Sequence, residues 1–531
     1  MTTNGYQLAA DWSRQGLFTG TLQDVTSYVI DEVVVSWGRN DGRTLEDAAA
    51  GKFTFSLDNS SRQFSDDNQS SPIAGDVLPG TPVRYNKTDP TNGATTSLFL
   101  GPMDELDTDP NAEGKDFTAS CADGWGLPGD TQLSTAVYQG QRTGDLINII
   151  LDAINWPPDR RDIDPGATVV PYWWLEGQDA DSAVDDLVHS EGTPAIAYVQ
   201  AGVFYFRDRH HRVTEARSLT SQGTYTHTIP GGAVGGAHRI LKNSFRRNHG
   251  LRNIINSATL EVTPRIPGNR QVVWSSDDPI VLGASEQVVL VIRTEDPFLD
   301  LQIPSNQVVY LEDGTWTFDY HLASGSVSFA LSRTSGQSAF LTITAGAGGA
   351  ILDLGIKLRG TPLGKGAARK FTAGNVGSEN TFGANDWAGP APWAHYYDAQ
   401  VLVDKMVNVY GQARPSISFD IDGAISSATL TEILGQQVSD RITVRNDELG
   451  LNADFMVERL THTVRRHGVR HILTVAAQVV EPTQAANPFL FDVAGHGFND
   501  GRFAMDGVNN PATMFRFDVA GHGFNDGVFA A

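Results

Sequence analysis

The sequence predicts a mainly β protein built from several domains, and three observations support this prediction. The chain has 531 residues, which is enough for about three or four domains of ordinary size. Hydrophobic residues make up 40% of it and charged residues 19%, a balance typical of globular proteins. Its 54 glycines and 25 prolines are spread along the chain, which favours many tight turns between short strands.

The first part of the chain carries strand signals at close spacing. Residues 28–37 are rich in β-branched and aromatic side chains, and residues 53–57 alternate apolar with polar side chains. A Pro/Gly turn at 78–83 leads into a further strand. We therefore expect residues 1–130 to form a small antiparallel β-barrel.

Helical periodicity begins after this region. Leu146, Ile147 and Ile150 lie at helical spacing, with Thr143 as the expected N-cap and Pro157 as the stop. A second short helix is expected over 179–192, followed by two strands joined at 200–202. Residues 131–238 are thus predicted to be a small α/β domain with a linker.

The next region returns to strand signals. Strand patterns every 8–12 residues over 270–362 are typical of a β-sandwich, and residues 364–392 read as a loop. A helix is expected over 398–411, with further strands up to Pro482. We expect 266–393 to be an insertion that divides a second barrel, formed by 239–265 and 394–482.

The chain ends with a repeat. FDVAGHGFNDGRFA at 491–504 returns as FDVAGHGFNDGVFA at 517–530, and the Asn-Asp-Gly turns predict a β-hairpin in each copy within 483–531. One hairpin cannot bury its own phenylalanines. Each copy is therefore expected either to dock on a partner protein or to fold back onto its own assembly. The docking hypothesis uses Phe489, Phe491, His496, Phe498, Phe503, Phe515, Phe517, His522, Phe524 and Phe529.

Charge and cysteine content exclude several classes of protein. The net charge of −23 argues against a sequence-independent nucleic-acid binder, and it suits either simple solubility or a surface that DNA slides past. A single cysteine, Cys121, excludes an internal disulfide and a Cys-based zinc site. The start shows no signal-peptide pattern, and no apolar run is long enough to predict membrane insertion.

An ordered set of motifs resembles a known family. It begins with VVVSWGRNDGRTLEDAAAGKFTFSLDNSSRQFS and the turn LPGTPV, continues through VFYFRDR, FRRNHGLRNIINSATLEVTPR and KLRGTPL, and ends with DKMVNVYGQAR, VSDRITV and HILTVAAQVVEP. Over residues 20–482 this order is similar to the minor tail proteins of siphophages that form the tail-tip baseplate hub, and to the hub of contractile phage tails.

The resemblance implies a fold and a function. It implies two tail-tube-like β-barrels per chain, arranged in a homotrimer around a channel through which viral DNA passes without specific binding. The implied partners are the distal tail protein ring, the C-terminus of the tape measure protein, and other minor tail proteins or fibres. The implied location is the virion tail tip, after assembly in the host cytoplasm.

Few residues of the sequence are candidates for catalytic, cofactor or metal sites. Cys121 lies in an alternating strand and is expected to be a buried thiol rather than a nucleophile. His210 and His211 are expected in a solvated basic loop, and AGAGGA at 345–350 in a hairpin turn rather than a phosphate loop. His462, His467 and His471 lack the spacing of a metal site. We therefore expect no catalytic residues, no cofactor and no metal.

The sequence leaves open two alternative functions for the insertion and two interpretations of one basic cluster. The 266–393 insertion could hold a cryptic cell-wall hydrolase, or a carbohydrate- or receptor-binding module using Trp274, Trp316, Trp387 and Trp393. A basic cluster stands out against the acidic whole, and it reads either as a solvated strand face or as a surface that pairs with acidic faces of a neighbouring chain. The cluster consists of Arg239, Lys242, Arg246, Arg247 and Arg252.

Overall fold

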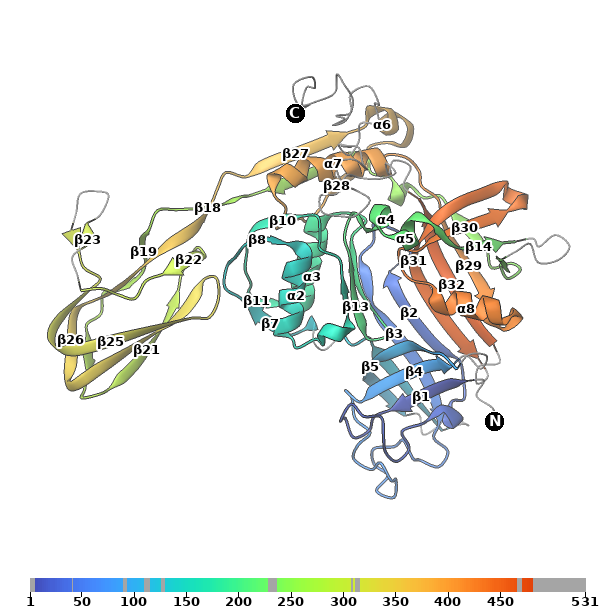
Figure 1. Ribbon diagram of the computed structural model, residues 1–531, viewed down its shortest axis with the longest axis horizontal. Coiled ribbons are helices and arrows are strands. Elements are labelled where there is room, and N and C mark those ends of the chain that lie inside the picture. The colour runs from blue at the N-terminus through green and yellow to red at the C-terminus, as the bar shows by residue number, and fades with distance from the viewer. Residues whose placement is uncertain are drawn as a thin grey trace.

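The computed structural model describes residues 5–40, 42–88, 93–108, 115–125, 129–227, 236–306, 309–310, 316–465 and 470–480. It is mainly β and multidomain, as the sequence predicts. Figure 1 shows three parts: a hub of long strands, an α/β domain packed against it, and an elongated sheet that projects from the far side of that domain. In the part of the chain described, no helix is long and apolar enough to cross a bilayer.

The N-terminal half of the hub is an antiparallel sheet with the order β1-β4-β5-β6-β3-β2. Its alternating sequence produces the fold: Phe53, Phe55 and Leu57 on β3 point into the core, while the residues between them are more exposed. The strands are β1 (Tyr6–Ala10), β2 (Val33–Arg39), β3 (Ala48–Asp58), β4 (Pro82–Thr88), β5 (Thr95–Thr108) and β6 (Asp116–Ala122).

The C-terminal half of the hub continues the same sheet. β2 pairs antiparallel with β31 from Val33↔Val464 to Gly38↔Arg459, so the strands of the two predicted barrels share one thirteen-stranded sheet. An isolated bridge joins Ile240, directly after β15, to Ile421 on β29. Its strands are β14 (Ser221–Thr226), β15 (Ala237–Arg239), β16 (Arg246–Asn248), β29 (Ser416–Asp422), β30 (Arg441–Asn446), β31 (Leu451–Arg465) and β32 (Arg470–Val479), with helix α8 (Ser427–Gly435).

The α/β domain contains the predicted helices and the predicted hairpin at 200–202. Leu146, Ile147 and Ile150 are buried on α2 as their spacing predicts. The N-cap prediction is wrong, because Thr143 is the first helical residue and its hydroxyl donates to Glu191 at 2.7 Å. The elements are β7 (Gln132–Ser134), β8 (Tyr138–Arg142), α2 (Thr143–Ala153), β9 (Arg161–Ile163), β10 (Val169–Trp173), β11 (Glu176–Asp179), α3 (Ala180–Glu191), β12 (Ile196–Gln200), β13 (Val203–Arg207), α4 (His211–Thr214) and α5 (Ala216–Leu219).

A three-stranded sheet and a long helix form the base of the insertion. β17 (Ser257–Val262) lies between β27 (Arg369–Gly374) and β28 (Asp386–Ala388), and α7 (Tyr396–Tyr410) packs on this sheet. The prediction of a loop over 364–392 is wrong, since this range contains β27, α6 (Val376–Phe382) and β28.

The projecting part of the insertion is built around one strand. β26 (Ser338–Lys365) is 28 residues long and pairs with each of the six other strands of a seven-stranded sheet. The predicted turn at 345–350 lies inside β26, so AGAGGA is strand rather than hairpin turn. The other strands are β18 (Arg265–Pro267), β19 (Gln271–Ser276), β20 (Ile280–Leu282), β21 (Gln287–Arg293), β22 (Phe298–Leu301) and β25 (Tyr320–Arg333), beside a small pair, β23 (Val309–Tyr310) and β24 (Trp316–Thr317).

Candidate functional site

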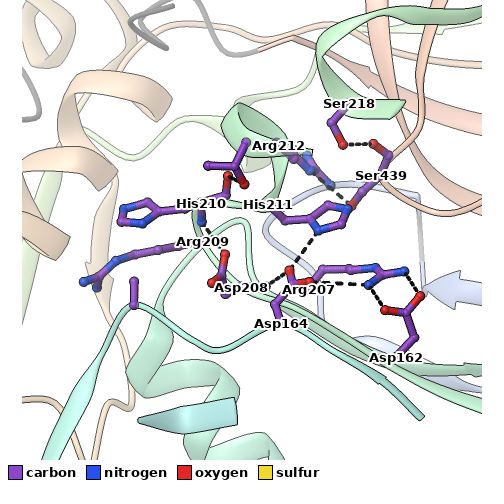
Figure 2. A network of polar contacts seen from close by, with 12 residues as sticks. Asp162, Asp164, Arg207, Asp208, Arg209, His210, His211, Arg212, Ser218 and Ser439 are labelled. Carbon is purple, nitrogen blue, oxygen red and sulfur yellow. Dashed lines mark hydrogen bonds and ion pairs between the residues drawn. The ribbon is translucent and has the colours of Figure 1, made fainter. Parts of the chain in front are cut away.

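The most highly organised polar site lies in the segment that follows β13. Arg207, Arg209, His211 and Arg212 are each less than a tenth exposed, so the prediction of a solvated basic loop at His210-His211 is wrong. The segment turns through the contact between the α/β domain and the hub. It meets Asp162 and Asp164 there (Figure 2), and Glu458 from the hub. Burial of these polar side chains is possible because each one has a carboxylate partner.

Glu458 on β31 is the centre of one cluster. Its two carboxylate oxygens accept hydrogen bonds from the Arg212 guanidinium, both at 2.8 Å, and Arg39 on β2 donates to it at 3.0 Å. The Thr44 hydroxyl donates to the same carboxylate at 2.5 Å. Complete burial acts to raise the pKa of Glu458, but Arg212 and Arg39 together hold that pKa below its ordinary value. Glu458 therefore stays charged and connects α4, β2 and β31.

Arg39 extends this cluster to the α/β domain. Its guanidinium also donates to the backbone carbonyls of Glu46, Pro194 and Ala195. The planar guanidinium can make several such bonds at fixed angles, which a lysine could not reproduce. A single side chain thus fixes the β2–β31 pairing relative to the loop between α3 and β12.

A second cluster lies at the end of β13. The Arg207 guanidinium makes two 2.8 Å bonds to Asp162, and the His211 Nδ1 lies 2.8 Å from Asp164 (Figure 2). The hydrogen bond from Arg207 lowers the pKa of Asp162. Burial raises the pKa of nearby Asp208 to about 6. These contacts hold β13 and α4 to the segment that includes β9.

Glu191 forms the third cluster, at the end of α3. Its carboxylate accepts from the Thr143 hydroxyl and from the backbone N–H groups of Ala167 and Thr168, at 2.7 to 2.9 Å. Arg209 reaches both Glu191, at 3.9 Å, and Asp398 on α7, at 3.0 Å. This cluster connects the α/β domain to the base of the insertion.

The three clusters are suited to holding parts together rather than to catalysis. The carboxylates of Glu458, Asp162 and Glu191 are occupied by donors from neighbouring segments, which leaves none of them free to act as a general base. Removing one partner would leave an uncompensated buried charge, which is strongly destabilising. We name the three together the ionic junction. Sequence reasoning missed it because each acidic partner lies far along the chain from its arginine.

A separate polar chain crosses the hub core. Tyr6 on β1 contacts the His471 Nδ1 at 2.7 Å, and the His471 Nε2 lies 2.8 Å from the His462 Nδ1. Burial lowers the pKa of His471 to about 3 and that of His462 well below its ordinary value. His467 lies outside the described residues. No group of three or more potential metal ligands is found in the part of the chain that the structure describes.

The structure also shows the surroundings of most of the remaining candidate residues. Cys121 is buried, and burial raises the pKa of its thiol, as expected for a structural cysteine. Trp274, Trp387 and Trp393 are partly buried and pack against three different cores. Arg239, Lys242, Arg246 and Arg247 are exposed. The side chains of Trp316 and Arg252, and all ten residues of the docking hypothesis, lie outside the described set.

Comparison with known proteins gives the following. No family model and no curated protein matches the sequence. The chain is similar in structure to the 43 kDa tail protein of prophage MuSo2 from Shewanella oneidensis, at 9% identity and a TM-score of 0.46, covering 90% of this chain and 98% of that one. It is similar to a tail protein from Neisseria meningitidis at 9% identity and a TM-score of 0.46, covering 90% and 96%.

A further solved structure is a component of the E. coli type VI secretion system, itself described as similar to the T4 tail proteins gp27 and gp5. The identity is 9% and the TM-score 0.36, covering 91% of this chain and 81% of that one. These neighbours are phage tail and baseplate-like proteins, the class that the ordered sequence motifs resemble.

Proposed function

We propose that the chain is a structural, non-enzymatic protein of the phage tail tip, where three copies form the baseplate hub. The observation that carries the proposal is the β2–β31 pairing, which fuses the first and last strand regions of the chain into one sheet. A ring built from such chains would contain two sheet units per copy, held at a fixed angle. Such a ring would join the tail tube and distal tail ring to the host-contacting proteins and surround the exit path of the DNA.

The ionic junction is suited to a structural protein that transmits force, because it holds the domains in one arrangement. Arg39, Arg212 and Glu458 hold the two hub halves to the α/β domain, and Arg209 with Asp398 holds that domain to α7. Buried charges that satisfy one another in a single geometry favour one arrangement of parts over its alternatives. A hub that transmits force from the tip to the tube requires such a fixed arrangement.

The predicted division of the chain belongs to this proposal. Residues 1–130 and the pair 239–265 with 394–482 would be the two hub units, and 131–238 the supporting domain. The 266–393 insertion would face outward towards neighbouring fibres or the host. The repeats of 483–531 would dock on another tail-tip protein through their phenylalanines.

Three measurements test the proposal. Antibodies against the insertion should label one end of the tail in particles that carry this protein, and label on the capsid or along the tube would contradict it. Light scattering on the full-length protein should give the mass of three chains. A zymogram on purified cell walls should stay clear of lysis, and a lytic band would favour the hydrolase alternative.

A further inference from the structure

One edge of the hub sheet is strongly basic. Arg239 ends β15, Lys242 follows it, and Arg246 and Arg247 form most of β16. All four are exposed, and all three residues of β16 are exposed although their side chains alternate between faces. Within the described residues β16 pairs only with β29, so its other side is a free strand edge. We name these four residues the basic edge.

The basic edge has no counter-charges of its own. None of its four side chains forms an ion pair among the described residues, and Arg246 donates only to the backbone carbonyls of Asn243 and Phe245. Some other exposed arginines of this acidic chain do find carboxylates, as Arg62 does with Asp67. Four uncompensated cations on a chain of net charge −23 indicate an anionic partner.

An acidic counterpart lies in the N-terminal half of the hub sheet, on β5. Beyond Pro102, β5 no longer pairs with β4 and keeps only β6 as a neighbour. Asp104, Glu105 and Asp107 lie on this stretch, are exposed, and form no ion pair among the described residues. We name these three residues the acidic edge. Figure 1 shows β5 on the side of the hub nearest the α/β domain, whereas β14 and β30 lie on the opposite side.

The two edges have complementary charge and complementary backbone. Charged side chains on an edge strand normally prevent it from pairing with another edge. Here each edge repels a second copy of itself but attracts the opposite edge. A contact between different surfaces of identical chains is head-to-tail, and such contacts generate closed rings when the rotation permits.

We propose that the basic edge of one copy pairs with the acidic edge of a second copy, strand against strand. The free backbone groups of β16 and of residues 104–108 would hydrogen-bond, and the side-chain charges would set the register. This inference rests on the proposed function in that it supplies the lateral contact of the hub ring. Nucleic acid is the other anionic ligand to consider, but the strongly acidic remainder of the chain would repel it.

The test uses charge reversal and charge exchange in the full-length protein. The first variant carries Arg246→Glu and Arg247→Glu, the second Glu105→Lys and Asp107→Lys, and the third carries all four substitutions. Sedimentation velocity at low salt follows the mass of each. We expect each reversal to weaken self-association by at least about tenfold and the four-fold exchange to restore it. High salt should weaken the wild type.

A matched control is Arg293→Glu on β21 of the insertion, which should leave the mass unchanged. Arg293 is exposed and forms no ion pair with any residue that the structure describes. Circular dichroism checks that every variant folds, and the recovery of association in the exchange variant serves the same purpose.

Three results would overturn the inference: reversals that leave the mass unchanged, a wild type that is monomeric at low salt at every concentration, or an exchange variant that fails to recover. In the last case a gel shift with duplex DNA at low salt would test nucleic acid as the partner. A trimer that survives both reversals overturns only this contact, whereas absence of the protein from tail tips overturns only the proposed function.

Discussion

Arg39 on β2 and Glu458 on β31 form a 3.0 Å ion pair although they lie 419 positions apart in the chain. The carboxylate is fully buried and the arginine is 5% exposed. The ion pair therefore links the two paired strands β2 and β31, which come from the first and last parts of the chain. Its removal should destabilise the whole hub.

Glu458→Gln should lower the free energy of unfolding by about 3–5 kcal/mol, because it leaves Arg39 and Arg212 buried without their counter-charge. Urea titration followed by circular dichroism measures the change. The control Glu32→Gln breaks the exposed pair with Arg465 and should cost less than about 1 kcal/mol. Equal effects of the two substitutions would contradict the role given to the ionic junction.

The stability of the hub should fall as the pH is lowered from about 6.5 towards 3. His471 has a folded pKa of about 3 and His462 a strongly lowered one, so the unfolded chain binds protons in this window that the folded chain does not. Each group contributes a slope of at most about 1.4 kcal/mol per pH unit.

The variant His471→Gln keeps a donor and an acceptor for Tyr6 and His462 but cannot titrate. Its free energy of unfolding, measured against pH, should show a shallower slope in that window. An unchanged slope in His471→Gln would exclude this histidine as its source.

Gly38→Ala should destabilise the β2–β31 pairing. Gly38 has φ of 103°, and an added Cβ would lie 2.4 Å from the backbone oxygen of Glu458. We expect a loss of about 2 kcal/mol or more in unfolding free energy. Gly75→Ala is the matched control, because it has φ of 79° and nothing within 4 Å of the added atom. If Gly38→Ala lowers the unfolding free energy no more than Gly75→Ala does, the close approach of Gly38 to the Glu458 backbone does not restrict this position.

Deletion of residues 487–531 should leave the hub fold intact and abolish binding of a distal tail-tip protein. Native mass and circular dichroism report the first effect, and particle composition by mass spectrometry reports the second. A deletion that dissociates or unfolds the hub would instead favour the alternative in which the repeats fold back onto their own assembly.

Local patterns predicted the elements, and distant contacts escaped them. The alternation at 53–57 predicts β3, and the spacing of Leu146, Ile147 and Ile150 predicts α2, because one face of each element is buried. RDRHHR at 207–212 is predicted to be a polar turn because its residues are all charged or polar and carry no apolar periodicity. Its burial depends on Glu458, which lies 246 positions beyond Arg212, and no local pattern carries that information.

Local sequence patterns also could not predict which strands pair with each other. The strand signals over 270–362 are correct, but they could not show that six strands would all pair with one long strand, β26. Short strands between glycines, such as β27, were missed because few residues alternate there.

The central place of β26 has a consequence for synthesis of the protein. Residues 338–365 come last among the strands of the projecting sheet, yet all six remaining strands of that sheet pair with them. On a ribosome, strands β18 to β22 and β25 must therefore wait without this partner until β26 emerges. Translation speed through this stretch, and chaperones that shield it, should govern the yield of correctly folded protein.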